Sequence, residues 1–204
     1  MTFHNRQFQN REQRPVPQEK KEEYAIILDV VLSNQNNFKN DEVAQAIGTT
    51  NYSLLELVPK QGIILKTGQK VYIGDGKRDE IQYIKRSLFV DKMSSSAKSE
   101  LEFAIKDIVL EKEKEYVDFF NKAGPISLRM HSLELIPSIG KKHTRSLLDE
   151  REVKPFESFD NIKQRCTFFS DPVKSIVERI ITEIETKDDI KIFVKKQKAF
   201  ESRE

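Results

Sequence analysis

The sequence predicts an α+β protein with a strand-rich N-terminal part, one long helix and an all-helical C-terminal part. Over residues 22–93, short apolar runs recur about every eight to twelve residues between Gly, Asn and Pro, which is typical of a small β-barrel or sandwich. Over residues 125–186, apolar positions recur at helical spacing, and a helix–turn–helix pattern occurs twice. We expect a helix over residues 94–124 to join the two parts.

The composition indicates a soluble chain with a modest core. Of the 204 residues, 37% are hydrophobic and 33% are charged. The formal net charge is only +2, so an anionic partner would have to be attracted by a local group of basic side chains. No apolar run has the length of a membrane span or resembles a secretory signal. We therefore expect a cytoplasmic protein with no membrane partner.

The two ends of the chain differ from the rest. Residues 1–21 are rich in Gln, Asn and Arg and lack periodicity, which predicts a disordered basic tail. Such a tail could follow a phosphate backbone, and a solvated spacer fits the same residues. Residues 187–197 alternate and end basic, which predicts a C-terminal strand, and residues 198–204 form a charged tail.

The expected strands lie at 24–32, 43–47, 52–58, 63–65, 70–73 and 81–90, and Gly74-Asp75-Gly76 predicts a hairpin turn. Basic and aromatic side chains alternate around this turn, as in barrels that hold single strands by charge and stacking. The rings could instead fill the core, which we favour for Phe89 and leave open for the two tyrosines. The candidate residues of the barrel are Tyr72, Lys77, Arg78, Tyr83, Lys85 and Arg86.

The connecting helix begins after the N-cap serines at 94–96 and ends at Gly124-Pro125. Alternating Glu and Lys at 111–115 interrupt its apolar stripe. We therefore expect the middle of this helix to cross solvent and to hold the two parts at a fixed distance.

The strongest candidate site lies at 133–148. An apolar helix expected over 126–136 ends at Pro137, a tight turn closes on Gly140, and a second helix starts at Lys141 and Lys142. A helix start leaves N–H groups unpaired and carries partial positive charge, so a phosphate is stabilised there. A corner without a ligand also fits this pattern but would gain more from Asp or Glu. We therefore favour phosphate binding by Ser138, Ile139, Gly140, Lys141, Lys142, Thr144 and Arg145.

This stretch resembles the helix-hairpin-helix motif, which holds a nucleic-acid backbone without reading bases. It departs from the motif where Ser138 replaces the usual first Gly and Thr144 replaces the usual Ala. A second copy follows, with Ser158 as an expected N-cap and Pro172 at the start of its last helix. This copy lacks Gly and is expected to be structural; its only residues suited to touch a phosphate are Ser170 and Lys174.

The order of these parts resembles an archaeal protein family of unknown function, DUF655. The resemblance covers about residues 22–196 and is carried by the strand run from Tyr24, Leu-Ile-Pro-Ser-Ile-Gly-Lys-Lys at 135–142 and Lys-Pro-Phe-Glu-Ser-Phe at 154–159. It implies an OB-like barrel, similar to small oligonucleotide-binding folds, joined to a doubled helix-hairpin-helix domain. Members are generally described as predicted RNA-binding proteins, so the resemblance also implies an RNA partner.

No catalytic or metal-binding constellation is evident. The three histidines, His4, His131 and His143, lack metal-site spacing; His143 is expected at the surface, with a phosphate contact as the alternative. Cys166, the single cysteine, lies beside two phenylalanines and is expected to be buried rather than nucleophilic. We therefore expect no enzyme activity, no cofactor and no metal.

We expect a monomer that binds nucleic-acid backbone, structured RNA first and duplex DNA second. Phosphate contacts do not distinguish the two, because they are blind to the 2′-hydroxyl. Two alternatives remain. The helical unit could serve as a protein–protein adaptor, or the chain could be a DNA-binding accessory factor. A nuclease or ligase accessory with hidden chemistry ranks last, because no catalytic constellation is evident.

Overall fold

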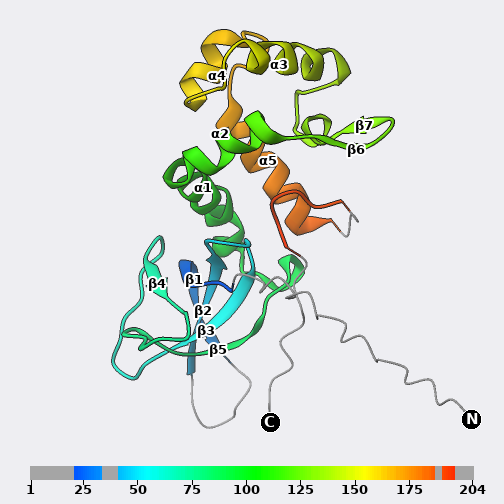
Figure 1. The fold of residues 1–204 in the computed structure, drawn as a ribbon. Coiled ribbons are helices and arrows are strands. Elements are labelled where there is room, and N and C mark those ends of the chain that lie inside the picture. Colours follow the sequence, from blue (N-terminus) through cyan, green and yellow to red (C-terminus); the bar gives the residue numbers. More distant parts are fainter. Residues whose placement is uncertain (1–20, 34–40, 187–189, 196–204) are drawn as a thin grey trace, which may run out of the picture.

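The structure, a computed structural model, describes residues 21–33, 41–186 and 190–195. It confirms the α+β class: a curled antiparallel sheet lies at one end, and helices extend from it to the other end (Figure 1). The expected tails over 1–21 and 198–204 lie outside the described residues, apart from Lys21. In the described part of the chain, no helix is both long and apolar enough to cross a bilayer.

The sheet is a five-stranded half-barrel with the strand order β4-β1-β2-β3-β5. Its members are β1 (Tyr24–Ser33), β2 (Asp41–Gly48), β3 (Leu54–Pro59), β4 (Lys70–Tyr72) and β5 (Ile81–Ser87). Five of the six expected strands are present, but 63–65 is irregular. The hairpin predicted at Gly74-Asp75-Gly76 is wrong, because β4 and β5 lie at opposite edges of the sheet.

Both faces of β1 are buried, which explains its nearly continuous apolar run. Ala25 and Ile27 pack with residues of β2, β3 and β4 in a core inside the curl. Ile26 and Leu28 point the other way, into a second core that includes α1 (Ser95–Glu111) and the C-terminal helices. The sheet and the helices therefore share this second core, whereas the first core is formed by the sheet and its loops.

The predicted connecting helix is two helices, α1 and α2 (Glu113–Lys122), with a break at Lys112. The Lys112 ammonium donates a hydrogen bond of 2.6 Å to the carbonyl of Thr49, after β2. In the middle expected to cross solvent, 111–115, Glu111, Lys114 and Glu115 are exposed, and Lys112 and Glu113 are half-buried. The part of α1 before this stretch is packed. Ile105, Ile108 and Val109 are fully buried, because α1 packs against β1 and against α5 (Pro172–Glu185) along its length (Figure 1).

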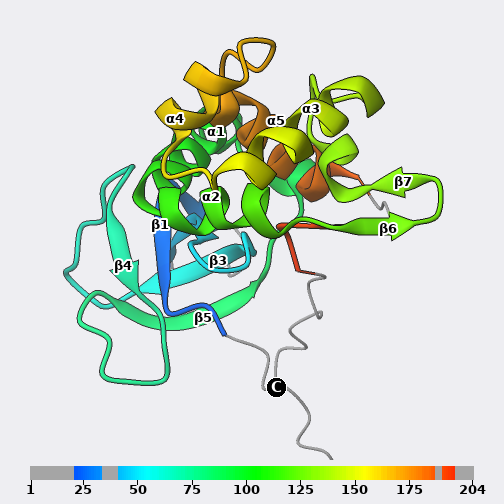
Figure 2. The same cartoon turned by 45° about the horizontal axis from the view of Figure 1, so that its top comes forward.

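The helix predicted over 126–136 is wrong as well. The segment forms a small hairpin, β6 (Pro125–Ser127) and β7 (Met130–His131), followed by a short 3₁₀ turn, η2 (Ser132–Leu135). Figure 2 shows this hairpin extending away from the helices. The remaining helices are α3 (Lys141–Val153) and α4 (Phe159–Arg165), followed by α5. The expected N-cap at Ser158 and the expected place of Pro172 at the start of α5 are confirmed.

Within the described residues 190–195 there is no strand, so the predicted C-terminal strand is not formed there. The segment is irregular and is held on α5 by one carboxylate. Glu183 accepts hydrogen bonds of 2.8 to 2.9 Å from the backbone N–H groups of Ile192, Phe193 and Val194. These donors are bound by a side chain, so they pair with no neighbouring strand.

Candidate functional site

Two buried isoleucines anchor the turn between η2 and α3 in the core. Ile136 and Ile139 are 1% and 3% exposed, and the N–H of Ile139 donates to the carbonyl of Ile136. Between them, Ser138 is exposed and has φ of +71°. This is the left-handed region that favours glycine. The backbone at position 138 therefore has a conformation that a glycine would adopt without strain, although the residue is Ser.

Helix α3 begins without a side-chain cap. Its N-cap is Gly140, whereas Ser94, Ser158 and Asp171 each accept a hydrogen bond from the first turn of α1, α4 and α5. Among the described residues, no hydrogen-bond partner is found for the N–H groups of the first three residues of α3. A Cβ placed on Gly140 would meet no atom within 4 Å. The first turn of α3 is therefore open to a close approach by an anion.

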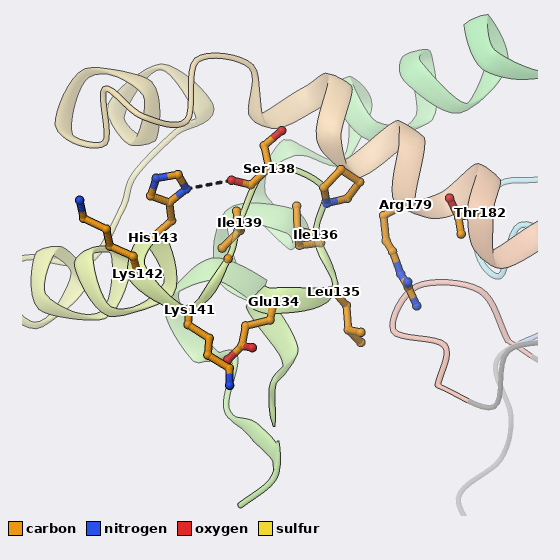
Figure 3. A pocket seen from close by; sticks show the side chains of 12 residues that line it. Glu134, Leu135, Ile136, Ser138, Ile139, Lys141, Lys142, His143, Arg179 and Thr182 are labelled. Carbon is orange, nitrogen blue, oxygen red and sulfur yellow. Dashed lines mark hydrogen bonds between the residues drawn. The ribbon is translucent and has the colours of Figure 1, made fainter. Parts of the chain in front are cut away.

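Three cations lie on the first two turns of α3. Lys141, Lys142 and Arg145 are exposed, and none of them forms an ion pair with another described residue. Figure 3 shows the side chains of Lys141 and Lys142 on opposite sides of the helix start. Full positive charges thus add to the partial charge of the helix end.

A pocket of about 660 Å³ lies at this turn. Residues 134–143 line it, together with Arg179 and Thr182 of α5 (Figure 3). Its one acidic lining residue is Glu134, whose carboxylate accepts a hydrogen bond of 3.2 Å from the N–H of His131. The pocket is therefore predominantly cationic.

Sequence reasoning missed Arg179, which comes from a helix 38 positions beyond Lys141. Its Nε donates to Glu183 at 2.7 Å, and its terminal nitrogen donates to the carbonyl of Ile190 at 2.7 Å. The signal in the sequence is the i, i+4 pair of Arg179 and Glu183 on an otherwise apolar helix face. That pattern identifies an ion pair but does not show which turn lies beside it.

Two predicted site residues point inward. Ile139 and Thr144 are 3% and 5% exposed, so a ligand could reach them only through their backbones. The Thr144 hydroxyl has no hydrogen-bond partner among the described residues. His143, expected at the surface, is half-buried and braces the turn: its Nδ1 lies 2.9 Å from the carbonyl oxygen of Ser138.

In the barrel, Tyr72 and Arg78 both support the turn at 74–76. The Tyr72 hydroxyl accepts a hydrogen bond of 3.1 Å from the N–H of Gly76, and a Cβ on Gly74 would lie 2.4 Å from that hydroxyl. Arg78 donates through Nε to the carbonyl of Gly74 at 2.9 Å. Lys77 beside them is exposed.

The other barrel candidates lie on β5, at the opposite edge of the sheet from Tyr72. Tyr83 is half-exposed and Lys85 is half-buried. Both guanidinium contacts of Arg86 go to Glu56, at 2.7 and 3.0 Å. Phe89 is 60% exposed, so its expected place in the core is wrong. The structure thus does not bring the barrel candidates onto adjacent strands.

The described residues contain no group of three or more His, Cys, Asp or Glu side chains that could hold a metal ion. Cys166 is fully buried, as expected, and burial followed by the charge of Glu150 raises the pKa of its thiol to about 11. Burial and then the charge of Arg151 lower the pKa of His131, whose Nδ1 accepts from the N–H of Leu133. Both side chains thus stay neutral near pH 7.

Comparison with known proteins places the chain among archaeal relatives. The family model described as "Protein of unknown function (DUF655)" matches residues 21–195. The chain is 36% identical over 182 residues to the Methanocaldococcus jannaschii protein MJ0038, covering 88% of this chain and 83% of the relative. The crystal structure of Af1531 from Archaeoglobus fulgidus, a DUF655 protein, is 39% identical. It matches with a TM-score of 0.79, covering 85% of this chain and 100% of the other.

Proposed function

The chain belongs to the DUF655 family, and we propose that it is a non-catalytic protein that binds structured RNA through the sugar–phosphate backbone. The observation that carries this proposal is the start of α3. It combines uncapped N–H groups, an N-cap without a side chain and two exposed lysines, Lys141 and Lys142, at one predominantly cationic pocket, with Arg145 exposed one turn further along α3.

The geometry suits a phosphodiester better than a small neutral ligand. Backbone N–H groups at a helix start donate toward an anion, and Lys141 and Lys142 can neutralise adjacent phosphates from either side of it. A structural corner would be expected to carry a capping side chain, as α5 does with Asp171. Phosphate contacts do not distinguish one base from another, so any base preference would come from elsewhere in the molecule.

Charge reversal at the helix start tests the proposal. The K141E/K142E variant should bind a structured RNA hairpin more weakly than the wild-type protein. Its plot of log K against log salt should also flatten by about two units, near 0.9 per lost phosphate contact. The measurement is fluorescence anisotropy with labelled RNA at several salt concentrations, repeated with duplex DNA of matched length.

The K98E/K106E variant is the matched control. It makes the same change of net charge at exposed lysines of α1 that form no ion pair with other described residues. It should retain the slope and most of the affinity. Equal losses of RNA affinity in both variants would show that overall charge, and not the start of α3, determines binding. Unchanged binding by K141E/K142E would refute the proposal. Tighter binding to DNA than to RNA would identify the DNA-binding alternative.

An adaptor role is the second candidate, favoured by one exposed apolar stripe. Phe103 and Leu110 on α1 are 65% and 49% exposed and lie seven residues apart, on the same helix face. A protein partner docking there would leave the start of α3 free. The F103S/L110S variant should then lose the partner while retaining RNA binding, as judged by size-exclusion chromatography of the complex.

A further inference from the structure

The β6–β7 hairpin carries a leucine that takes no part in the core. Leu128 is 107% exposed and occupies a two-residue tip with Arg129, which is also exposed. The tip is ordered by a hydrogen bond of 3.3 Å from the N–H of Arg129 to the hydroxyl of Ser127. A Leu side chain gains free energy when it is buried, so a projecting leucine at an ordered tip is suited to contact another molecule.

The base of this hairpin is fastened to the same turn that leads to α3. Ser132 donates through its backbone N–H and its hydroxyl to the carbonyl of Gly124, at 3.1 and 2.8 Å. His131 and Glu134 form a reciprocal capping box at η2, directly after β7. The tip is therefore held in a defined position relative to the start of α3.

The surface under the hairpin is continuous with the pocket at α3. A second pocket, lined by β6, the tip and β7, shares two residues with the first, Glu134 and Lys141. Lys141 thus stands between the two pockets, with Arg129 on the hairpin side and Lys142 on the helix side. An occupant that spans them meets Lys142, Lys141 and Arg129 along its length, with the Glu134 carboxylate also at the junction, and one apolar side chain at the tip. Three cations against one carboxylate, beside an exposed leucine, suit a nucleic-acid backbone next to an accessible base.

We infer that the hairpin inserts Leu128 beside an unstacked base of the nucleic acid whose phosphates lie at the start of α3, while Arg129 contacts the flanking backbone. This inference rests on the proposed function and adds the preferred substrate: a bulge or a helix–loop junction. Apolar wedges, leucine among them, enter base steps by partly unstacking them, which costs free energy. That cost is lowest where the base is already unpaired. A protein partner at Leu128 is the competing outcome.

The experiment uses the full chain and an RNA hairpin with a single bulged 2-aminopurine, whose fluorescence rises when it is unstacked. Binding of the wild-type protein should raise that fluorescence. The L128S variant should still bind, with affinity reduced about fivefold to tenfold, but the fluorescence rise should be lost. V153S, at the 85% exposed last residue of α3, is the matched control and should behave like the wild type. The wild-type protein should bind a probe without the bulge more weakly than the bulged probe. The L128S variant should bind the two probes equally.

The outcomes separate the two proposals. If the wild type binds the RNA and K141E/K142E does not, but L128S still raises the fluorescence fully, the wedge is refuted and the phosphate site stands. If K141E/K142E binds as well as the wild type, or if the wild type binds no RNA, the proposed RNA-binding function is refuted. The insertion of Leu128 beside a base is then refuted too, because it rests on that function. Loss of a copurifying protein from L128S, with RNA binding and fluorescence unchanged, would also overturn the wedge.

Discussion

The imidazole of His143 stacks on the ring of Phe168, with centroids 4.4 Å apart and planes inclined by 17°. The same imidazole contacts the carbonyl of Ser138 through Nδ1. His143 therefore joins the turn before α3 to the turn between α4 and α5. The turn between α4 and α5 thus supports the position of the turn that precedes α3.

Stability should reveal this coupling. H143A removes a hydrogen bond and a ring stack, so we expect the free energy of unfolding to fall by about 1–2 kcal/mol. A double-mutant cycle with F168A should give a coupling energy of about 0.5–1.5 kcal/mol in urea denaturation. Strictly additive losses would show that the stack contributes nothing.

Gly140 offers a way to separate binding from folding. Its φ of −95° is open to any residue and an added Cβ meets no atom, so G140A should change stability by less than about 1 kcal/mol. The methyl group would project where a phosphate should approach the N–H groups, so RNA affinity should fall. Anisotropy and urea denaturation on the same sample test this. Full affinity in a folded G140A protein would argue against backbone contacts at this turn.

Glu183 should be needed to hold the segment at 190–195. Its fully buried carboxylate accepts from three backbone N–H groups and from Arg179. E183Q leaves Arg179 without its charged partner, and we expect a loss of about 3–5 kcal/mol. Limited proteolysis should then cut the E183Q variant near residue 190. The control variant E185Q, changed at an exposed neighbouring residue, should stay uncut there. Equal protection of both variants would contradict this role.

The hydroxyl groups of Tyr52, in the turn between β2 and β3, and Tyr116, on α2, form a buried hydrogen bond. Burial raises the pKa of both hydroxyl groups above the ordinary value near 10. Above that pH the unfolded chain loses these protons first, so it binds fewer protons than the folded chain and stability falls as pH rises.

We expect the free energy of unfolding to be independent of these groups below about pH 10. Above it, the loss should approach about 1.4 kcal/mol per pH unit for each tyrosine. Y52F/Y116F should show a shallower decline between pH 9 and pH 11, measured by urea denaturation. An identical slope in both proteins would show that other groups cause the alkaline loss.

Features encoded within a few neighbouring residues could be predicted from the sequence. Caps at Ser94 and Ser158 and the proline at the start of α5 were predicted and observed, because each depends on a side chain next to its own helix end. The open start of α3 was predicted for the same reason. Its role in binding stays a prediction.

The sequence by itself determined the α+β class, most strand positions and the turn that closes on Gly140, since these follow from local periodicity and capping. Only the tertiary structure decided that α1 and α2 break at Lys112, which bonds to Thr49 63 residues away. It also decided that Phe89 is exposed and that Glu183 holds residues 192–194. These outcomes depend on contacts between residues that are distant in the sequence, and a local sequence pattern does not specify such contacts.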